Sequence, residues 1–446
     1  MSATYSRFSV VAVRAVATSA VRDAGNQEEF LERTSAALGT NVEIISGAEE
    51  ARLIHLGVEA RWPRAKERIL IIDVGGGSAE LIVSHSGQLI DSVSKPLGAV
   101  RLTSMFLKSD PPRGEELHRM DAYIDEKLGP FQKLHGTEKF ARTIVTSATA
   151  GAIVAAANGI PRGKRDEADR MAAKASQVKE LYLTLARSAV AERRKITGIG
   201  PRRAEIVVAG AAVFLRTMQL FDIKSLYYSV AGVRDGIIAD LAARGVGREL
   251  SQLSKDQRAV VEAMARKFAV NVKHARHVAA IAHRLFELLQ PVHMLPSEAG
   301  KLIESAGYLH DIGHFISDTS HHKHSAYLVA NSDMPGFTDK ERLTLAALCR
   351  FHRKSLPQAR HSHFQALESD SKRVVQGLAP LLRIADSLDR GHEQKVKEVS
   401  VSTADSILTV LAQTDEDADL EIWAANEAAK SFRDVFGMVL TIQRAR

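Results

Sequence analysis

Short apolar runs alternate with longer amphipathic stretches over the first half of this 446-residue chain. The apolar runs that predict strands cover residues 10–17, 42–45, 70–83 (two strands around a turn), 88–93, 141–146 and 225–229. The stretches that predict helices cover residues 26–38, 48–58, 115–128 and 203–215. Strands that alternate with helices are typical of an α/β fold, in which helices pack on a sheet.

The pattern changes near Gly247. From there to Leu388 helical periodicity dominates, and 13 of the 17 histidines lie at or after His274. A strand pair is expected over residues 396–410 and a helix over residues 416–436. We therefore place a domain boundary at residue 247 and expect the domain that follows to be all-α in class.

The most unusual feature of the first half is a glycine turn between two apolar strands at residues 70–83. Gly75, Gly76 and Gly77 are expected to adopt positive φ and to let the backbone approach a ligand closely. Their N–H groups can converge on a phosphate. Asp73 and Glu80 flank the turn and can hold a hard cation such as Mg²⁺. The alternative is a plain β-hairpin, because short glycine motifs occur often by chance.

Composition narrows the class of protein. Apolar residues make up 45% of the chain and charged residues 25%, as in ordinary globular proteins. The net charge of +7 favours an acidic partner, such as a polyphosphate, a nucleotide, a nucleic acid or an anionic membrane. The single cysteine, Cys349, excludes a disulfide framework within the chain and fits a reducing cytoplasm. No apolar run has the length of a membrane-spanning helix, so we expect a cytoplasmic protein.

Two charged residues near strand ends are candidates for catalysis. Arg22 follows the Thr18-Ser19 turn and can bind phosphate through two parallel hydrogen bonds. Glu50 lies on the predicted helix 48–58, where its carboxylate can deprotonate an attacking water. The residues alone favour another interpretation for Glu50, a solvated charge beside a Glu49–Arg52 surface pair.

Several spaced segments resemble the exopolyphosphatase / guanosine pentaphosphate phosphohydrolase family. They are residues 42–54, 72–82 and 96–102, the turn at 146–149 and residues 231–236. The resemblance implies an actin-like (ribonuclease H-like) α/β fold with two lobes, here at residues 1–62 and 63–246. It implies that Glu50 is the catalytic base and that Mg²⁺ or Mn²⁺ binds Asp73 and Glu80. The phosphate-binding residues it implies are Arg22, Gly75, Gly76, Gly77 and Ser78.

The same resemblance implies a substrate. The expected reaction is the release of terminal phosphate from inorganic polyphosphate, and the alternative substrate is guanosine pentaphosphate. A homodimer is the usual state of the family, and neither a membrane nor a specific nucleic acid is expected as a partner.

The chain departs from the family pattern at one point. Family members open with an Asp-x-Gly-Ser-Asn-Ser loop, and this sequence contains no such loop. We therefore expect a truncated first lobe, in which the strands at residues 10–17 and 42–45 have an unpaired edge. The departure also motivates an alternative function, a non-catalytic protein that binds polyphosphate or a guanosine alarmone.

The histidine-rich second half contains a separate candidate site. His274, the His310-Asp311 pair and Asp386 lie on three predicted helices, and such residues can converge on a divalent metal inside a helical bundle. The order His, His-Asp, Asp resembles the HD-domain phosphohydrolases, which implies these four residues as ligands. His277 is less favoured. His324 and His352 could hold a second metal or contact phosphate, and a further alternative places the main chemistry, hydrolysis of a nucleotide, in this domain.

Overall fold

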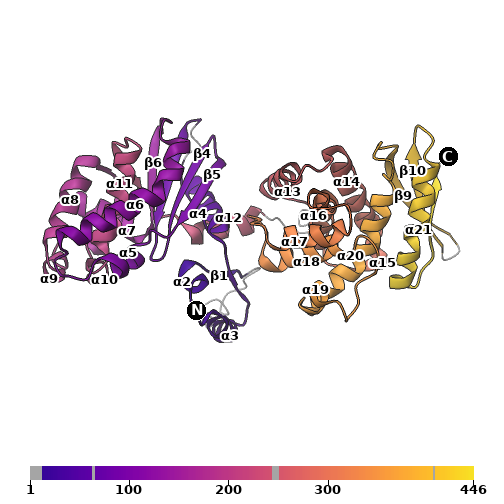
Figure 1. Cartoon of the computed structure of the whole chain (residues 1–446), viewed down its shortest axis with the longest axis horizontal. Coiled ribbons are helices and arrows are strands. Elements are labelled where there is room, and N and C mark those ends of the chain that lie inside the picture. Colours follow the sequence, from indigo (N-terminus) through magenta and orange to yellow (C-terminus); the bar gives the residue numbers. More distant parts are fainter. Residues whose placement is uncertain (1–12, 63–65, 244–250, 405–406, 446) are drawn as a thin grey trace. The chain divides into compact units, whose positions relative to one another are not determined.

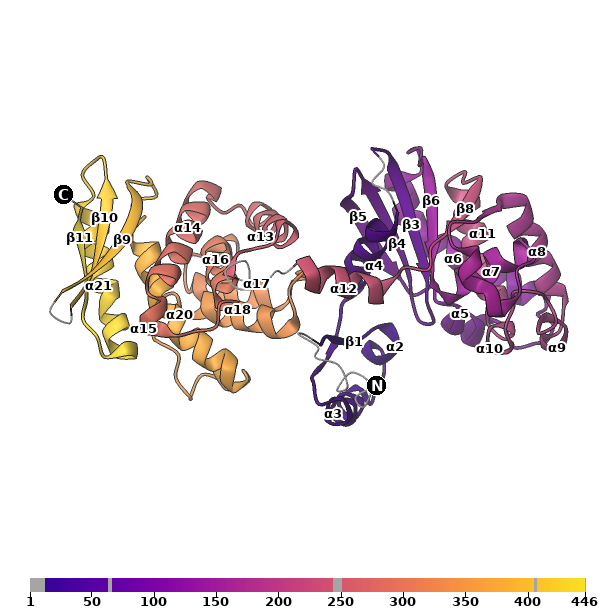
Figure 2. The ribbon, with the colours of Figure 1, turned by 180° about the vertical axis from the view of Figure 1, so that it is seen from behind.

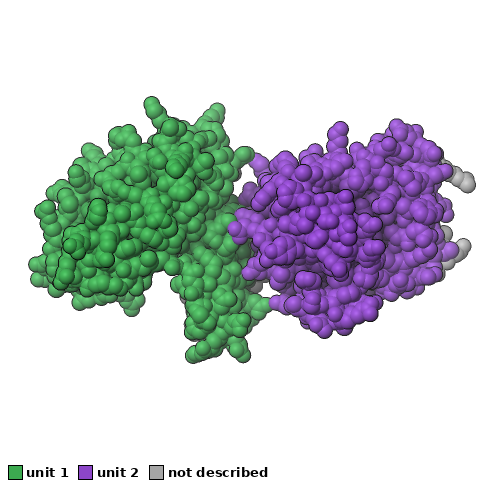
Figure 3. Space-filling view, viewed as in Figure 1, with its two compact units in different colours: residues 1–242 green, residues 243–446 purple. Residues whose placement is uncertain are grey.

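The computed structural model describes residues 13–62, 66–243, 251–404 and 407–445. The chain divides into two compact units, residues 1–242 and 243–446, which Figure 3 shows in different colours. The division of the first unit into two lobes at residue 62 stays a prediction. The expected boundary at residue 247 lies outside the described residues.

A six-stranded mixed sheet forms the centre of the first unit, in the order β5-β4-β3-β6-β8-β7 (Figure 1). The strands are β3 (Arg68–Val74), β4 (Ala79–His85), β5 (Gln88–Lys95), β6 (Arg142–Thr146), β7 (Ala172–Lys174) and β8 (Ser225–Tyr228). Strands β3, β4 and β5 form an antiparallel meander, and β6 and β8 continue the sheet parallel to β3. The sequence pattern predicted all of these strands except β7, which has only three residues.

Both faces of this sheet are covered by helices, because alternate residues of a strand point to opposite faces. Leu70, Ile72 and Val74 of β3 pack in one core with residues of α6, α7 and α11, whereas Ile69 and Ile71 pack against α4. The helices of this unit, besides two near its N-terminus, are α4 (Gly47–Arg61), α5 (Ala99–Phe106), α6 (Gly114–His135), α7 (Ser147–Ala157), η1 (Arg162–Ala168), α8 (Ala175–Arg187), α9 (Val190–Arg193), α10 (Pro201–Ala204), α11 (Val207–Leu220) and α12 (Val233–Ala243).

A second, much smaller sheet precedes α4. Its strands β1 (Ala15–Ala17) and β2 (Val42–Ile44) are parallel, and α2 (Ser19–Arg22) and α3 (Gln27–Leu38) connect them. Each of the two strands has one partner strand within the described residues, and the expected unpaired edge stays a prediction. Residues 10–12 of the expected first strand lie outside those described.

The second unit is a helical bundle that ends in a small sheet (Figure 2). Its helices are α13 (Lys255–Lys267), α14 (Val272–Leu288), α15 (Gln290–His293), α16 (Ala299–Leu309), η3 (Ile312–Phe315), α17 (His321–Ala330), α18 (Asp339–Phe351), α19 (Ser362–Gln365), α20 (Ser369–Ser387) and α21 (Asp419–Phe436). The sheet has the order β11-β10-β9 and contains β9 (Val396–Ala404), β10 (Ile407–Thr414) and β11 (Leu440–Arg444).

The expectation of an all-α class for this unit is wrong because of these strands. The strand pair expected over residues 396–410 is present as β9 and β10, and β11 was not predicted. Strand β11 pairs parallel with β10 after the α21 crossover, so its place depends on a partner that is distant in sequence.

Candidate functional site

Three acidic side chains meet at one end of the large sheet, and we call Glu50, Asp73 and Glu80 the acid cluster. Asp73, in β3, and Glu80, in β4, are directly opposite each other across the antiparallel pair. Glu50 is buried on the first turns of α4. The Ser94 hydroxyl donates a hydrogen bond to Glu80 Oε1 at 2.8 Å and orients that carboxylate. The structure thus brings together the three residues that the sequence predicted as base and cation ligands, and these roles stay predictions.

The glycine turn lies between Asp73 and Glu80 and packs on the N-terminus of α5. The carbonyl oxygens of Gly75 and Gly76 accept hydrogen bonds from the N–H groups of Ala99 (2.9 Å) and Val100 (3.0 Å). Within the described residues, the N–H groups of Gly76 and Gly77 have no hydrogen-bond partner, so they remain able to bind an anion.

The prediction that these glycines adopt positive φ is wrong, because none of Gly75, Gly76 and Gly77 does so. At Gly77 the reason is steric instead, because an added Cβ would lie 2.5 Å from the Ser19 hydroxyl oxygen. The neighbouring Gly98 is restricted in the same way, since its Cβ would lie 2.2 Å from the Gly76 carbonyl oxygen. The turn is therefore closely packed against the Ser19 side chain on one side and against the backbone of Gly98 on the other.

The mutual repulsion of the carboxylates in the acid cluster favours a bound cation. Burial, followed by repulsion from Glu80 and Asp73, raises the pKa of Glu50 to about 8. Burial and repulsion from Glu80 raise the pKa of Asp73 to about 8, and burial raises the pKa of Glu80. Glu50 Oε2 is buried without a hydrogen-bond partner in the described part of the chain. A site whose donors are carboxylate oxygens fits a hard divalent cation such as Mg²⁺.

Arg22 supplies positive charge at this cluster. Its Nη1 atom lies 4.0 Å from Glu50 Oε2 and donates a hydrogen bond to the Ile45 carbonyl oxygen at 2.6 Å. Sequence reasoning missed Thr18, whose hydroxyl lowers the pKa of Glu50 by hydrogen bonding, and also missed Ser94. Both are short polar residues whose roles depend on tertiary placement.

A buried ion network holds the helix that carries Glu50. Arg52 donates hydrogen bonds to Glu49 and to Asp240 of α12, both at 2.8 Å. Arg14 donates to the same two carboxylates at 3.2 and 3.1 Å. The expectation that Glu49 and Arg52 form a surface pair is therefore wrong, because both side chains are buried.

Helix α4 also touches α12 through backbone. A Cβ added to Gly236 of α12 would lie 1.8 Å from the Leu53 carbonyl oxygen of α4. Ion pairs and close backbone contact together fix the position of Glu50.

In the second unit, four residues from three helical segments meet, as predicted, and we call His274, His310, Asp311 and Asp386 the histidine–aspartate cluster. His310 Nε2 lies 3.4 Å from Asp386 Oδ1 and 3.6 Å from Asp311 Oδ2. His274 Nε2 lies 3.6 and 3.9 Å from the same two oxygens. Helices α14 and α16 approach closely here, because a Cβ on Gly307 would lie 2.4 Å from the Cα atom of Ala279.

The charges in this cluster are balanced within the protein. Burial alone would lower the pKa of His310, but Asp311 and Asp386 raise it to about 9. Burial alone would raise the pKa of Asp386, but the nearby His274 and His310 rings, whose Nε2 atoms lie 3.6 and 3.4 Å from Oδ1, hold it well below its usual range. The Nε2 atoms of His274 and His310 are buried and lack hydrogen-bond partners among the described residues. Imidazole and carboxylate donors in this arrangement fit a first-row transition metal.

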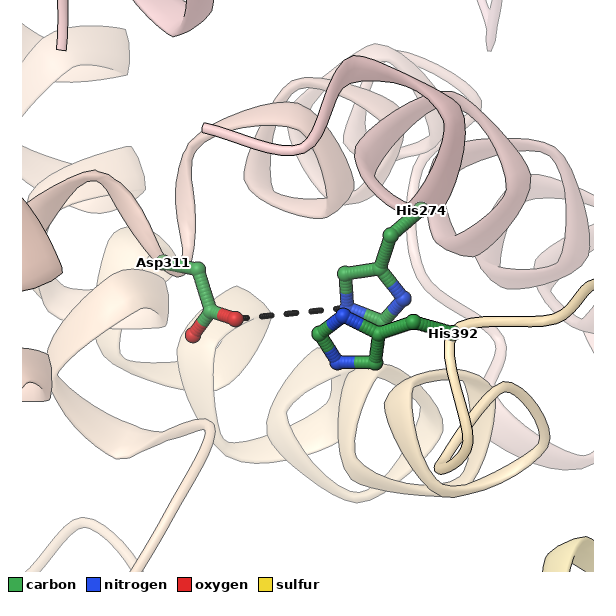
Figure 4. Close-up of side chains that lie close together, drawn as sticks. All are labelled: His274, Asp311 and His392. Carbon is green, nitrogen blue, oxygen red and sulfur yellow. Dashed lines mark ion pairs between the residues drawn. The ribbon is translucent and has the colours of Figure 1, made fainter. Parts of the chain in front are cut away.

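Sequence reasoning missed two residues beside His274. Asp389 Oδ2 accepts a hydrogen bond from His274 Nδ1 at 2.9 Å and orients the ring. The His392 ring stacks on the His274 ring with their centroids 3.7 Å apart, and Figure 4 shows the two rings lying face to face near Asp311. Asp389 stands three residues after Asp386, so a search of the residues around each predicted ligand could have found it.

Of the two histidines expected at a second metal, the structure brings only His352 to the cluster. His352 Nε2 lies 3.8 Å from Asp311 Oδ1, and His321, which was not predicted, lies 3.4 Å from the same oxygen. His324 and His277 belong to none of the groups of three or more metal-ligating side chains in the described residues.

Two family models match the chain over most of its length. The model of the Ppx/GppA phosphatase family matches residues 3–244, more than half of the chain, and that of Ppx/GppA phosphatase domain III matches residues 257–423. The chain belongs to the Ppx/GppA phosphatase family. The family resemblance inferred from the sequence is thereby confirmed, while the role of each site residue stays a prediction.

Solved structures of Ppx/GppA proteins resemble the chain. An exopolyphosphatase-like protein is 29% identical, with a TM-score of 0.51, over 55% of this chain and 81% of its own. An exopolyphosphatase from Cytophaga hutchinsonii is 27% identical, with a TM-score of 0.50, over 54% of this chain and 77% of its own. A Ppx/GppA enzyme from Aquifex aeolicus is 28% identical, with a TM-score of 0.48, over 53% of this chain and 78% of its own. None of the described helices of this Ppx/GppA protein is long and apolar enough to cross a membrane.

Proposed function

We propose that this Ppx/GppA phosphatase releases terminal phosphate from inorganic polyphosphate, with the acid cluster as its active site. The observation that carries the proposal is the buried Glu50 carboxyl group, whose pKa is raised to about 8 opposite two further carboxylates. A general base is most effective when its pKa is near the working pH. In its ionised form Glu50 is therefore suited to take a proton from water.

Each step of the proposed reaction uses a group of this chain. The N–H groups of Gly76 and Gly77, the Ser78 side chain and the Arg22 guanidinium bind the terminal phosphate. Glu50 removes a proton from water as the water oxygen bonds to phosphorus. The P–O bond to the rest of the polyphosphate breaks, and the shortened chain leaves with the electron pair. Asp73 and Glu80 would hold Mg²⁺ or Mn²⁺, which supplies positive charge to the phosphate oxygens.

The family resemblance also supports coarser inferences. We infer an actin-like arrangement of the first unit, a homodimer and a cytoplasmic location, and these rest on the resemblance rather than on a contact within the chain. Size-exclusion chromatography with light scattering tests the dimer, since a mass close to the 48.6 kDa of one chain would contradict it.

The test of the proposed function is phosphate release from polyphosphate by the purified chain with Mg²⁺. Glu50→Gln should lower the rate about 10²–10⁴-fold, the usual contribution of a general base. The matched control is Glu59→Gln on the same helix, where the amide can still accept a hydrogen bond from Ser84, and it should remain active. Full activity of Glu50→Gln would overturn the assignment of the base.

Guanosine pentaphosphate is the alternative substrate, because the family covers both reactions and one phosphate site can serve both. Turnover of the two substrates by the same preparation decides between them. Binding of either substrate without any phosphate release would instead support the non-catalytic alternative.

We also propose that the histidine–aspartate cluster binds a divalent metal, as in HD-type domains. The supporting observation is that the buried Nε2 atoms of His274 and His310 have no hydrogen-bond partner among the described residues and face the carboxylates of Asp311 and Asp386. Metal analysis of His310→Ala and Asp311→Ala should show loss of this metal. If that loss also abolished hydrolysis of a nucleotide, the main chemistry would lie in the second unit.

A further inference from the structure

A cavity opens at the end of the large sheet that is opposite the acid cluster. Its volume is about 490 Å³, and small-molecule sites typically have about 300–1,000 Å³. It is lined by the first residues of β6 and β8 and by the loops before them, at residues 136–141 and 221–224. Strands β6 and β8 run parallel to β3, and Asp73 is near the C-terminal end of β3. We call this cavity the strand-start cavity.

Aromatic rings form part of the cavity lining. Phe140, Phe221 and Tyr227 line it, and the ring centroids of Phe140 and Phe221 are 6.4 Å apart. Phe221 is buried, whereas Phe140 and Tyr227 are half-buried and keep part of their surface open. Aromatic side chains are typical walls of sites that bind a small organic ligand, and their faces suit a planar ring.

Arg142 lines the cavity beside these rings. Its Cζ atom lies 5.7 Å from the ring centroid of Tyr227 and 5.1 Å from that of Trp62, and those two rings meet edge to face. Aromatic faces attract a guanidinium group and hold it in place, but they do not neutralise its charge as a carboxylate would. Arg142 is half-buried and forms no ion pair with a carboxylate in the described part of the chain.

The acidic residues that line the cavity already have basic partners. Glu138 pairs with Arg68, and Asp222 pairs with Lys224. These pairs cancel their own charges and leave the cavity with a surplus of positive charge. A half-buried guanidinium group without an opposite charge is costly, so Arg142 favours a bound anion.

Two cations and two backbone donors remain available to that anion. The second cation, Lys139, also lines the cavity and likewise has no carboxylate partner among the described residues. The N–H groups of Lys139 and Phe140 donate no hydrogen bond within those residues. Guanidinium, ammonium and free N–H groups are the donors that bind phosphate oxygens. A single phosphate is much smaller than the cavity, so a ligand that fills it also reaches the aromatic rings.

We propose that the strand-start cavity binds a phosphate monoester that carries a planar ring. The phosphate binds Arg142 and Lys139. The ring packs against Phe140 and Tyr227. The proposal goes beyond the phosphatase function, because this ligand is bound and not hydrolysed.

The proposed site is distant from the acid cluster along α4. Glu50 is in the first turn of α4, whereas Trp62, whose ring holds Arg142, directly follows the last residue of that helix. About 18 Å of helix therefore lies between them, at about 1.5 Å per residue. A failure of either proposal leaves the other intact.

Isothermal titration calorimetry of the full chain with AMP tests the proposal. A chelator in the buffer removes divalent cations, on which phosphate binding at the acid cluster is expected to depend. AMP has both the phosphate and the planar ring, so it should bind more tightly than inorganic phosphate or adenosine, each of which has only one of them. Absence of AMP binding, or equal affinity for AMP and either smaller ligand, would overturn the proposal.

Two substitutions at the cavity should weaken AMP binding. Lys139→Met and Arg142→Met each remove a cation but keep an apolar side chain, and the loss of a charged hydrogen bond should lower AMP affinity about 10–100-fold. Lys139 is exposed on a loop, so its variant should fold even if Arg142→Met does not. Arg22→Met at the acid cluster is the matched control and should keep wild-type AMP affinity. Loss of AMP binding in Arg22→Met alone would assign AMP to the acid cluster and overturn the proposal.

Trp62 gives an independent measurement of where AMP binds. The chain has two tryptophans, so in a Trp423→Phe variant only Trp62 remains. Its ring contacts Arg142, and AMP bound there should change Trp62 emission with the same dissociation constant as calorimetry gives. An emission that stays constant while AMP saturates the protein would place the ligand elsewhere and contradict the proposal.

Discussion

In the first unit, Glu50, Asp73 and Glu80 face one another, and the Arg22 guanidinium approaches no closer than 4.0 Å to Glu50. In the second unit, Asp311 and Asp386 are surrounded by imidazoles. Both clusters consist of buried and half-buried side chains, yet the pKa values of the three acids in the first are raised, and those of the two aspartates in the second are lowered. In the second cluster the positive charge that compensates the carboxylates comes from neighbouring histidines, whereas the first cluster has no such histidines.

This difference determines what each site can bind. The acid cluster has oxygen donors and unbalanced negative charge, which a hard cation from solution would neutralise. The histidine–aspartate cluster contains its own cationic partners when metal-free, and a metal must displace the protons that they share. The first site should therefore exchange Mg²⁺ readily, whereas the second should retain a transition metal and bind it less well in acid.

Among the tests that separate the two sites, Asp73→Asn should give the largest effect. The amide removes a negative charge from the acid cluster, and loss of one electrostatic element in an active site costs about 10²–10³ in rate. Phosphate release with Mg²⁺ is the measurement, and metal content of the second unit should not change. The control is Asp91→Asn. Asp91 lies on β5, is partly exposed and pairs with His135. Near-normal release by Asp73→Asn would remove the acid cluster from the mechanism.

Asp389→Asn tests the histidine–aspartate cluster of the second unit and should have a smaller effect, which is a loss of metal affinity. Asp389 orients His274 through Nδ1, and loss of such an outer partner typically lowers metal affinity about 10–100-fold. Competition with a chelating dye measures that affinity. Phosphate release should remain at the wild-type rate, because Asp389 and the acid cluster are in different units. An unchanged metal affinity would show that the His274 ring does not need the hydrogen bond to Asp389 in order to bind metal.

A pH series should give the smallest effect, a change in unfolding temperature. In metal-free protein the folded-state pKa values of Glu50 and Asp73, about 8, exceed their unfolded values, so the folded state binds more protons between pH about 4.5 and 8. Raising the pH from 5 to 6.5 should therefore destabilise the first unit, because these two carboxyl groups outweigh the opposite contribution of His55, whose pKa burial lowers to about 4. The second unit should instead gain stability over this range, because burial lowers the pKa of His352 to about 3 and that of His322 to about 4, so that its unfolded state binds more protons there.

Tryptophan fluorescence can measure this change for each unit. The chain has two tryptophans, Trp62 and Trp423, one in each unit. In a Trp423→Phe variant, Trp62 reports on the first unit, whose unfolding temperature should fall by about 2–4 °C for each kcal/mol lost. Saturating Mg²⁺ should flatten this dependence, since it keeps the acids ionised. A rise in stability with pH over this range would contradict the raised pKa values.

Local patterns predicted most of the fold because its strands and helices carry clear periodicity. The apolar runs around residues 70–83 and 141–146 correspond to β3, β4 and β6, and the helix that ends at Gly39 has that glycine at φ 70° as its C-cap. Strands β7 and β11 were missed because they have three and five residues and depend on partners distant in sequence.

The candidate sites were predictable to the extent that their residues stand in recognisable motifs. Asp73, Glu80 and the His310-Asp311 pair are such residues, and the family resemblance supplied Glu50. Ser94 and His321 were not predictable, because a serine on a strand and a histidine within a run of histidines carry no signal of their own. Their roles arise only when β5 approaches β4 and α17 approaches α16.

The contact between α4 and α12 has a consequence for dissecting the chain. Asp240 accepts hydrogen bonds from both Arg14 and Arg52, and Gly236 lies against the backbone of α4. A fragment that ended before α12 would leave two buried guanidinium groups short of a carboxylate, at a cost of several kcal/mol. A recombinant fragment of the first unit alone should therefore extend at least through residue 242, and a shorter one should be recovered as insoluble protein.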